Sequence, residues 1–273
     1  MSDPRPAAIR RLAEAGVATS RLDARLLWDH AERNQSLFEG YVRRRIAREP
    51  LAYITGFKEF WSLEFEVDRN VLIPRPETET IVEQVLERFP GGSAPLRILD
   101  LGTGSGCLLA ALLTEYRGAR GLGIDSSERA LAVAARNLSR HGLEGRAALK
   151  AGDWMAGLEG ERWDVIVSNP PYIPSGDIAA LAPEVRDYEP HAALDGGPDG
   201  LDSIRALATG LARLPNFLAF VEIGAGQAGQ VRELMAAAGL AVLHIAPDLA
   251  GIPRIVVIAD SPEKRVGLTP VTG

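Results

Sequence analysis

The sequence predicts an α/β fold, with a doubly wound, mainly parallel sheet preceded by a small helical domain. From Arg97 onward, strand-like and helix-like segments alternate, which is typical of a parallel sheet covered by helices on both faces. A length of 273 residues exceeds that of most single domains. We therefore expect a helical domain at 1–56, a β-hairpin connector at 57–75 and the sheet domain at 76–273.

The N-terminal segment is predicted to form three short helices. Ile9 and Leu12 lie at helical spacing in the first of them. Ser20 and Ser36 are each followed three residues later by an acidic residue, and both pairs resemble capping boxes at helix starts. Pro50 is expected to close this unit. Its few apolar positions predict only a small core.

The connector is predicted from the residues between Phe57 and Leu72. Aromatic and β-branched residues there favour two short strands, with Trp61-Ser62 at the turn between them. Prolines on both sides of Arg75 precede a new helix that is expected to run to about Arg88.

The remaining elements follow from the alternation of apolar segments. We expect strands at 97–101, 120–124, 146–150, 163–168, 216–223, 240–246 and 254–260. We expect helices at 105–116, 127–140, 200–213 and 226–238. No helix separates the last two strands, which predicts a final antiparallel strand. The Pro- and Gly-rich stretch 170–199 is too long for a simple connector, so we interpret it as a functional loop.

Composition excludes several classes of protein. A single cysteine, Cys107, allows no intrachain disulfide, and four histidines without ligand spacing predict no metal site. Apolar runs fall short of the ~18 residues of a membrane span. The N-terminus lacks the apolar region of a signal peptide, so we expect a cytoplasmic protein with no membrane contact. Residues 1–58 carry a net charge of +4 and the rest −10, which disfavours direct binding of nucleic acid.

A glycine-rich loop, Gly102-Thr103-Gly104-Ser105-Gly106, follows the first predicted strand of the sheet domain. Ligands of such sheets bind beyond the carboxyl ends of the strands, where glycine allows close approach of the backbone. The spacing differs from the G-x-G-x-x-G of dinucleotide-binding proteins. The alternative is a tight turn that binds nothing.

Asp125 ends the next strand, where a carboxylate can accept hydrogen bonds from both hydroxyls of a ribose. The alternative is a helix N-cap, because Ser126 and Ser127 follow. Together, the loop and Asp125 favour an adenosine-type ligand. Asp153-Trp154 follows the third strand and could border an adenine ring, but a partly buried core tryptophan explains the pair equally well.

Asn169-Pro170-Pro171-Tyr172 directly follows the strand predicted at 163–168. The prolines stiffen the backbone and remove two N–H donors, so the Pro170 carbonyl and the Asn169 side-chain oxygen are two fixed acceptors. Tyr172 adds a flat ring. These groups suit a planar substrate that carries an NH₂ group, such as a carboxamide or adenine. The alternative is a rigid surface turn.

These motifs resemble those of known enzymes. Asp100–Gly106 resembles motif I of S-adenosylmethionine-dependent class I methyltransferases, and Val167–Tyr172 resembles the signature of methyltransferases that act on planar nitrogens. Three further segments, 48–56, 71–79 and 189–201, are similar to segments of one family. The chain is thereby identified as a member of the bacterial peptide chain release factor N5-glutamine methyltransferase (PrmC/HemK) family.

The resemblance implies a Rossmann-like class I domain with seven strands. It implies methyl transfer from S-adenosylmethionine, with S-adenosylhomocysteine as product, to the Gly-Gly-Gln glutamine of class I release factors. By this resemblance, the positions that contact the cofactor are Gly102, Thr103, Gly104, Ser105, Gly106, Asp125, Trp154 and Asn169, to which the sheet-edge position adds Asp153.

The same resemblance assigns the substrate side of the site to Asn169-Pro170-Pro171-Tyr172. Asn169 and Pro170 would accept hydrogen bonds from the glutamine amide and Tyr172 would pack on it, so these three are the predicted catalytic residues. The N-terminal domain would help to hold the release factor, and we expect a monomer.

Three alternatives are left open. An adenine-N6 methyltransferase of DNA or RNA shares the Asn169–Tyr172 motif, but the acidic sheet domain opposes it. A glutamine methyltransferase of a ribosomal protein differs only in substrate. A non-catalytic S-adenosylmethionine-binding module would not need the intact motif.

Overall fold

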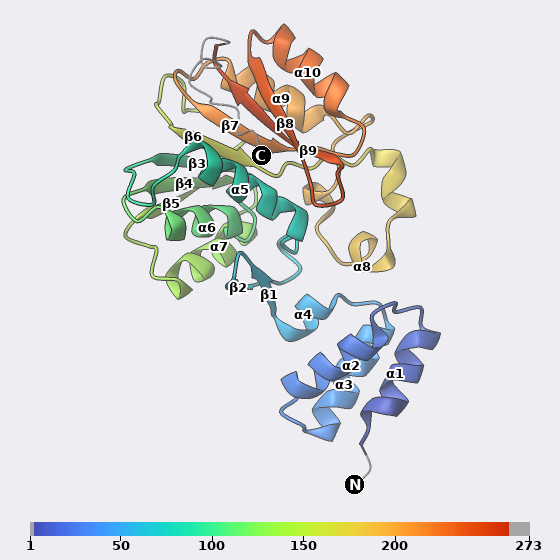
Figure 1. Ribbon diagram of the computed structural model, residues 1–273. Coiled ribbons are helices and arrows are strands. Elements are labelled where there is room, and N and C mark those ends of the chain that lie inside the picture. The colour runs from blue at the N-terminus through green and yellow to red at the C-terminus, as the bar shows by residue number, and fades with distance from the viewer. Residues whose placement is uncertain (1–2, 262–273) are drawn as a thin grey trace.

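The computed structural model describes residues 3–261 (Figure 1). Four helices form the N-terminal part, seven strands form one sheet, and a two-stranded hairpin lies between these two parts. In Figure 1 the N-terminal helices lie below the sheet domain and are joined to it through the hairpin. Among the described residues, no helix combines the length and apolar character required to cross a membrane.

The N-terminal part contains four helices, not the three predicted. They are α1 (Arg5–Glu14), α2 (Ser20–His30), α3 (Gln35–Ile46) and α4 (Leu51–Thr55). The fully buried Leu12, Leu27 and Phe38 form the centre of their common core. Pro50 does not close the unit, because it precedes α4, and its fixed φ suits the start of a helix.

Both predicted capping boxes are wrong. Ser20 is the first residue of α2, and its N-cap, Thr19, makes no side-chain capping bond. The side chain of Asn34 caps α3 by accepting hydrogen bonds from the backbone N–H groups of Ser36 and Leu37. Asn34, and not the predicted Ser36, therefore accepts hydrogen bonds from the unpaired backbone N–H groups at the start of α3.

The hairpin prediction is confirmed by β1 (Phe57–Phe60) and β2 (Leu63–Glu66), which pair antiparallel. Its two turn residues, Trp61 and Ser62, have φ values of 53° and 57°, as a type I′ turn requires. The expected helix after Arg75 is also present. It begins with a 3₁₀ turn, η1 (Pro76–Thr78), and continues as α5 (Glu79–Arg88).

The seven predicted strands of the large sheet are all present. They are β3 (Arg97–Leu101), β4 (Arg120–Asp125), β5 (Ala147–Ala151), β6 (Val165–Ser168), β7 (Leu218–Glu222), β8 (Ala241–Pro247) and β9 (Pro253–Ala259). Their order is β5-β4-β3-β6-β7-β9-β8. The first five are parallel, and β9 runs antiparallel between β7 and β8. The expected final antiparallel strand is therefore confirmed.

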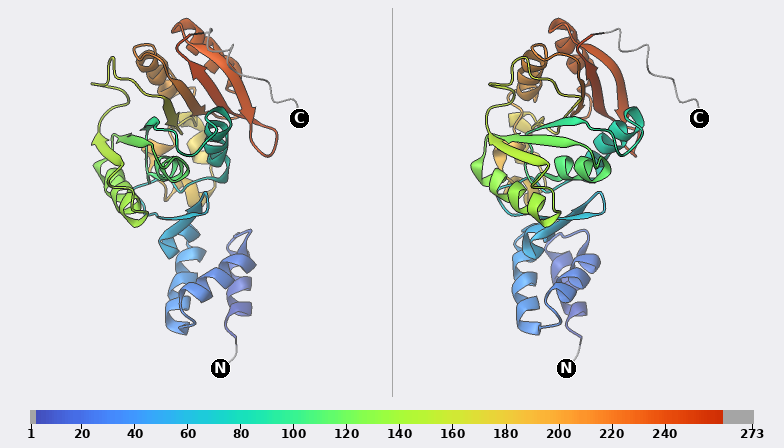
Figure 2. Two further views of the ribbon diagram at one scale, coloured as in Figure 1. Left: turned by 60° about the vertical axis from the view of Figure 1, so that its left-hand side comes forward. Right: turned by 90° about the vertical axis from the view of Figure 1, so that its left-hand side faces the viewer.

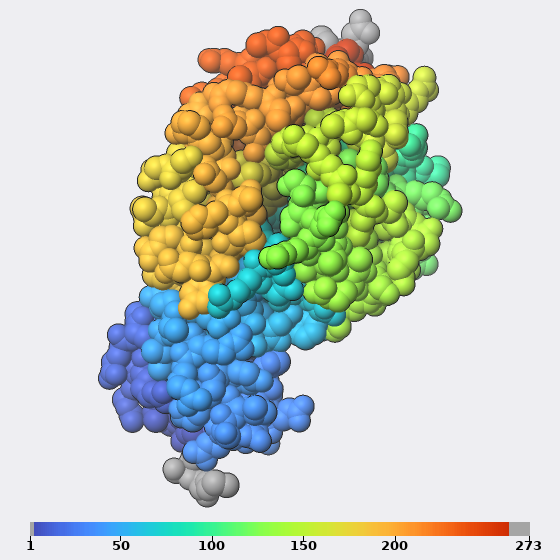
Figure 3. All heavy atoms as spheres, turned by 180° about the vertical axis from the view of Figure 1, so that it is seen from behind, coloured from blue at the N-terminus to red at the C-terminus, as the bar shows by residue number. Residues whose placement is uncertain are grey.

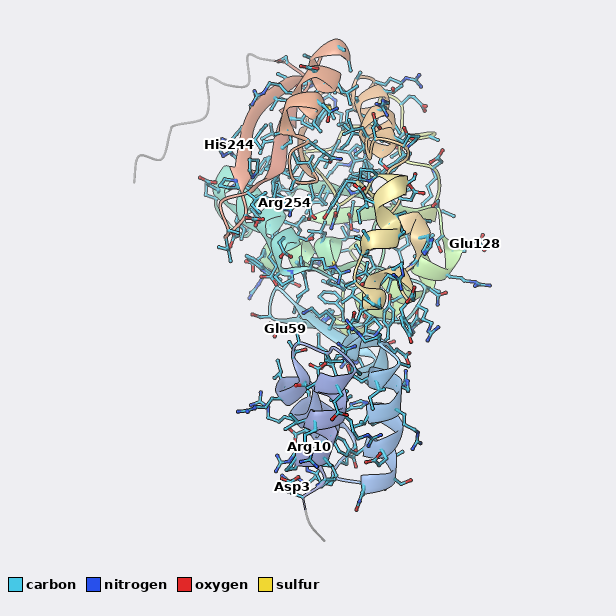
Figure 4. The ribbon with its side chains drawn as sticks, turned by 90° about the vertical axis from the view of Figure 1, so that its right-hand side faces the viewer. Asp3, Arg10, Glu59, Glu128, His244 and Arg254 are labelled. Atoms are coloured by element: carbon cyan, nitrogen blue, oxygen red, sulfur yellow. The ribbon has the colours of Figure 1, made fainter. Side chains whose placement is uncertain are left out.

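Helices cover both faces of this sheet (Figure 2). The connecting helices are α6 (Cys107–Glu115), α7 (Glu128–Arg140), α9 (Asp202–Leu211) and α10 (Ala228–Ala237). Successive strand residues point to opposite faces, so Ile98 packs in the core with α5 and α6, while Leu99 packs in the core with α9 and α10. In the view of Figure 4, Glu128 on α7 and Arg254 on β9 lie on opposite sides of the sheet domain.

The register of the parallel strands places their carboxyl ends at one edge. Leu101 pairs with Ile124 and Ser168, and Ser168 pairs with Val221. The residues that come next in each strand or loop must therefore meet at this edge. They are Gly102, Asp125, Asn169 and Glu222.

The stretch 170–199 contains three short helical turns, η2 (Ser175–Ala180), α8 (Pro183–Arg186) and η3 (His191–Ala193). It also contacts the N-terminal helices. Glu184 accepts hydrogen bonds from Arg45 at 3.0 Å and from Arg48 at 2.6 and 2.7 Å. The Tyr188 hydroxyl donates to the Ala47 carbonyl at 2.5 Å. These bonds link the helical part to a segment of the sheet domain.

Candidate active site

A cavity of about 240 Å³ lies at the carboxyl edge of the parallel strands. Figure 3 shows a hollow on this face between the yellow-to-orange and the green parts of the chain. The predicted site residues that line the cavity are Gly102, Thr103, Gly104, Ser105, Asp125, Asp153, Trp154, Asn169 and Pro171. Residues from four separate loops therefore meet at one place, as the strand register requires.

The glycine loop is held in shape by Asp100 at the end of β3. The Thr103 hydroxyl donates to the Asp100 carboxylate at 2.6 Å. Burial raises the pKa of Asp100 to about 7, although the bond from Thr103 opposes this shift. Gly102 has a φ of 71°, and a Cβ added there would point into open space. The loop thus leaves room for a ligand beside its backbone.

Gly106 differs from the other loop residues, because it does not line the cavity. It is the N-cap of α6, with a φ of 79°, and a Cβ there would lie 3.2 Å from the Cβ of Ala134. The structure therefore gives this glycine a packing role between α6 and α7. A cofactor contact at Gly106 stays a prediction.

Asp125 lines the cavity and already accepts two backbone hydrogen bonds. Gly104 donates to one carboxylate oxygen and Ser127 to the other, each at 2.9 Å. The N-cap of α7 is Ser127, whose hydroxyl accepts from the Ala130 N–H, so Asp125 is not the cap itself. The bond from Gly104 fixes the carboxylate next to the glycine loop, where a ribose could also reach it.

Trp154 is at once a partly buried core residue and a residue of the cavity wall, so it fits both alternatives considered for it. Its ring packs partly against the core formed with α9 and α10, and the residue also lines the cavity. Its φ of 49° is left-handed, a conformation that is uncommon outside glycine. Asp153, beside it, is exposed at the cavity rim.

Asn169 is connected to Tyr172 through Thr78, which lies in the 71–79 segment quoted for the family resemblance, and through Glu222, which sequence reasoning missed. The Asn169 side-chain NH₂ donates to the Thr78 hydroxyl at 2.9 Å, and Thr78 donates to the Glu222 carboxylate at 2.7 Å. The Tyr172 hydroxyl donates to the other oxygen of Glu222 at 3.0 Å. We call these four residues, Asn169, Thr78, Glu222 and Tyr172, the amide network.

Glu222 is the most buried member of the amide network, with 1% of its surface exposed. Burial raises its pKa, and burial together with the adjacent Glu222 raises the pKa of Tyr172 above its ordinary value. Tyr172 is therefore a neutral donor at physiological pH. Tyr172 and Pro170 do not line the cavity directly, since Pro170 is buried and Tyr172 is turned to Glu222.

The signal for Thr78 and Glu222 was weak in the sequence. Thr78 reads as part of a helix start, and Glu222 as the polar end of an apolar strand. Only the sheet register, which sets β7 beside β6, places Glu222 next to the Asn169 segment. A polar residue ending a central buried strand was the one usable indication.

A second set of contacts joins the segments before and after the hairpin to each other and to the 170–199 stretch. Arg75 donates to Glu189 at 2.5 Å, and the Tyr53 hydroxyl donates to the Val71 carbonyl at 2.6 Å. Pro74 and Pro190 line the cavity next to these contacts. The three segments quoted for the family resemblance are therefore in physical contact, and two of them, 71–79 and 189–201, line the cavity.

Comparisons with known proteins agree with this geometry. Residues 78–182 match the methyltransferase small domain family. The release factor glutamine methyltransferase of Caulobacter vibrioides is 44% identical over 276 residues, which cover 94% of this chain and 95% of the relative. That of Rhodospirillum rubrum is 46% identical over 267 residues, covering 89% and 80%.

A solved methyltransferase from Pyrococcus furiosus shares the fold, with a TM-score of 0.53, 18% identity and coverage of 82% of this chain and 98% of that chain. This likeness shows a shared fold. The matched family model and the two relatives show that the domain is a methyltransferase domain. Identity above 40% over 95% of one relative and 80% of the other shows the closer relationship. The chain belongs to the release factor glutamine methyltransferase family.

Proposed function

We propose that this protein transfers a methyl group from S-adenosylmethionine to the side-chain amide nitrogen of the glutamine in the Gly-Gly-Gln motif of class I release factors. One observation carries the proposal. Asn169 lines the same cavity as the glycine loop and Asp125, so an amide-binding group lies beside a nucleoside-type site. The two relatives reported above are named for this activity.

The residues around the cavity fit S-adenosylmethionine. The open space beside Gly102 allows the ligand to approach the backbone, and Asp125 can accept hydrogen bonds from the ribose hydroxyls. Trp154 offers a ring and Asp153 an acceptor at the rim for the adenine. When bound, this cofactor supplies an electrophilic methyl group on a sulfonium centre.

The chemical difficulty lies in the glutamine, because the lone pair of an amide nitrogen is delocalised into the carbonyl. The Asn169 side-chain oxygen and the Pro170 carbonyl would accept hydrogen bonds from its two N–H groups and orient the nitrogen for in-line attack. Correct orientation can supply roughly 7–11 kcal/mol. The two acceptors also stabilise the positive charge that develops on nitrogen.

No strong base is required at this site, because the amide nitrogen becomes acidic once it is alkylated. The proton can then leave to water. Tyr172 would pack its ring on the substrate amide while its hydroxyl is held by Glu222. Pro171, which lines the cavity, would border the same amide.

The N-terminal region, residues 1–56, is proposed to hold the release factor. It carries exposed apolar side chains at Leu22, Leu26 and Leu37, and a positive charge balance that differs from the acidic remainder. The acidic remainder supports a protein substrate over a nucleic acid. We propose that the protein acts as a monomer in the cytoplasm, where release factors function.

Mass spectrometry of a purified release factor tests the proposed function. After incubation with enzyme and S-adenosylmethionine, we expect one added methyl group on the Gly-Gly-Gln glutamine. A release factor in which alanine replaces that glutamine is the matched control and should gain none. Equal or faster methyl uptake by ribosomal protein or by an oligonucleotide would contradict the proposal.

A further inference from the structure

The hydrogen bonds of the amide network have a direction, which follows from the number of hydrogens available. Thr78 is 2% exposed and lies between Asn169 and Glu222. A hydroxyl has one hydrogen to donate, and Thr78 donates it to Glu222. Its oxygen can therefore only accept from Asn169, and the Asn169 group that faces it must be the NH₂.

An amide is planar, with its NH₂ and its oxygen on opposite branches. When the NH₂ of Asn169 is bound to Thr78, its oxygen is the branch left for another partner. Asn169 lines the cavity, so that partner can be a ligand there. A reversed amide would present two donors to a substrate NH₂ group, which also donates, and the two would repel each other.

We infer that Glu222 and Thr78 are positioning residues that hold the Asn169 side chain with its oxygen toward the substrate amide. This inference rests on the proposed function, since it assumes a substrate that donates N–H. Neither residue needs to touch the reacting atoms. They act by fixing the hydrogen-bond direction of Asn169, which contacts the substrate amide.

The chemistry of Glu222 fits this role. Thr78 and Tyr172 both donate to it, one to each oxygen. The two donated hydrogen bonds favour the ionised form of Glu222 and oppose the rise in its pKa that burial causes. An ionised carboxylate provides two acceptor oxygens, whereas a carboxamide provides one acceptor and one donor. With glutamine at position 222, one of the two hydroxyls would have to reverse, and either reversal disturbs a group at the substrate side of the site.

The first test compares Thr78→Val with Thr78→Ser. Valine keeps the shape but removes the hydroxyl, so kcat for release factor methylation should fall roughly tenfold to a hundredfold, the effect of one lost buried hydrogen bond. Serine should restore most of the activity. Thr114→Val, on the exposed face of α6, is the matched control and should leave kcat unchanged.

The dissociation constant of S-adenosylhomocysteine, measured by calorimetry, separates this role from a defect in the cofactor site. It should change little in Thr78→Val, because the affected group faces the substrate. Equal losses of kcat in the valine and serine variants would overturn the inference. So would a loss of cofactor affinity as large as the loss of kcat.

The second test is Glu222→Gln, with Glu233→Gln on the exposed face of α10 as its control. We expect kcat to fall in the first variant and not in the second. Neutron diffraction of the wild-type protein gives a reading that does not depend on activity. It should show the deuterium atoms of the Asn169 amide toward Thr78, and that of Thr78 toward Glu222.

These measurements separate two kinds of failure. If the wild-type enzyme methylates no release factor, the proposed function fails, and the neutron structure still decides the direction of the network. If the wild-type enzyme is active but the Asn169 oxygen faces Thr78, the proposed function stands and this inference is wrong.

Discussion

Arg75 and Glu189 form an ion pair at 2.5 Å although 114 residues separate them in the sequence. The Glu189 side chain is 1% exposed and also accepts a hydrogen bond from the Ile73 N–H at 3.2 Å. This pair holds the segment after the hairpin against the 170–199 stretch. Both segments line the cavity, so the ion pair joins two parts of its wall.

Replacing Arg75 should be costly because it leaves a buried carboxylate without its counter-ion. We expect Arg75→Met to lower the free energy of unfolding by about 3 kcal/mol. Adding Glu189→Gln should recover part of that loss, since the double variant no longer buries a charge. Urea denaturation measures both values. A double variant that is less stable than Arg75→Met would contradict this explanation.

Asn169→Ala should separate catalysis from cofactor binding. Removing this proposed acceptor, which would stabilise the charge that develops on the substrate nitrogen, is expected to lower kcat roughly a hundredfold. The dissociation constant of S-adenosylhomocysteine should change only slightly, because the glycine loop and Asp125 are untouched. Steady-state kinetics and calorimetry on the same preparation provide the two readings. Equal loss of both would refute the role given to Asn169.

Replacing Asp125, in contrast to Asn169, should weaken cofactor binding. Asp125→Ala removes the proposed acceptor of the ribose hydroxyls and is expected to weaken cofactor binding roughly tenfold or more. Asp125→Asn, which keeps one acceptor oxygen for the Gly104 N–H, should weaken it less. Calorimetric titration with S-adenosylhomocysteine tests both variants. An unchanged dissociation constant in the alanine variant would rule out the ribose contact.

Glu184 should stabilise the contact between the N-terminal helices and the sheet domain. Arg45, 7% exposed in its side chain, would lose its bond to Glu184 in the variant Glu184→Ala and keep those to Asp23 and to the Glu49 carbonyl. We expect a loss of about 2 kcal/mol in the stability of this contact. Amide hydrogen exchange should rise in α3 and α8, and it should not rise in the exposed control Glu14→Ala.

The pKa of Asp100 predicts a dependence of stability on pH. Burial raises it from an ordinary 3.8 to about 7, so the folded protein holds a proton that the unfolded chain releases. The contribution of Asp100 to stability is therefore greatest at acidic pH and declines as pH rises through about 7. Asp100→Asn cannot titrate and should lack this decline.

Thermal denaturation of the wild type and the Asp100→Asn variant at about pH 5 and about pH 8 measures the difference. The wild type should lose stability relative to the variant between these two values. A constant difference at both would show that Asp100 does not titrate in this range. Other groups titrate equally in both proteins, so the comparison isolates this one.

Much of the fold could be predicted because its information is local. The apolar periodicity of each strand and the turn residues Trp61 and Ser62 depend on near neighbours. The helix caps were predicted wrongly. Thr19, Ser20, Asn34 and Ser36 are all capping types that lie within one or two residues of a helix start, so residue type alone does not specify which of them is the N-cap.

The residues of the site also divide into those that the sequence predicted and those that it did not. Most of the residues predicted to surround the cofactor do line one cavity, because parallel strands bring their carboxyl ends to one edge. Gly106 shows the limit of a motif, since its missing side chain serves the packing against Ala134. The motif specifies a glycine at this position without showing what lies beside it.

By itself, the sequence determined the α/β class, the order of the elements and the groups proposed to bind an amide and a nucleoside, because spacing and residue type are written along the chain. The tertiary structure alone decided which distant residues support them. Thr78 and Glu222 are 144 residues apart, and their 2.7 Å hydrogen bond exists only because the sheet places β7 beside β6 and η1 lies over this edge. A hydrogen bond requires contact within about 3 Å, and no pattern along the sequence specifies such a distance.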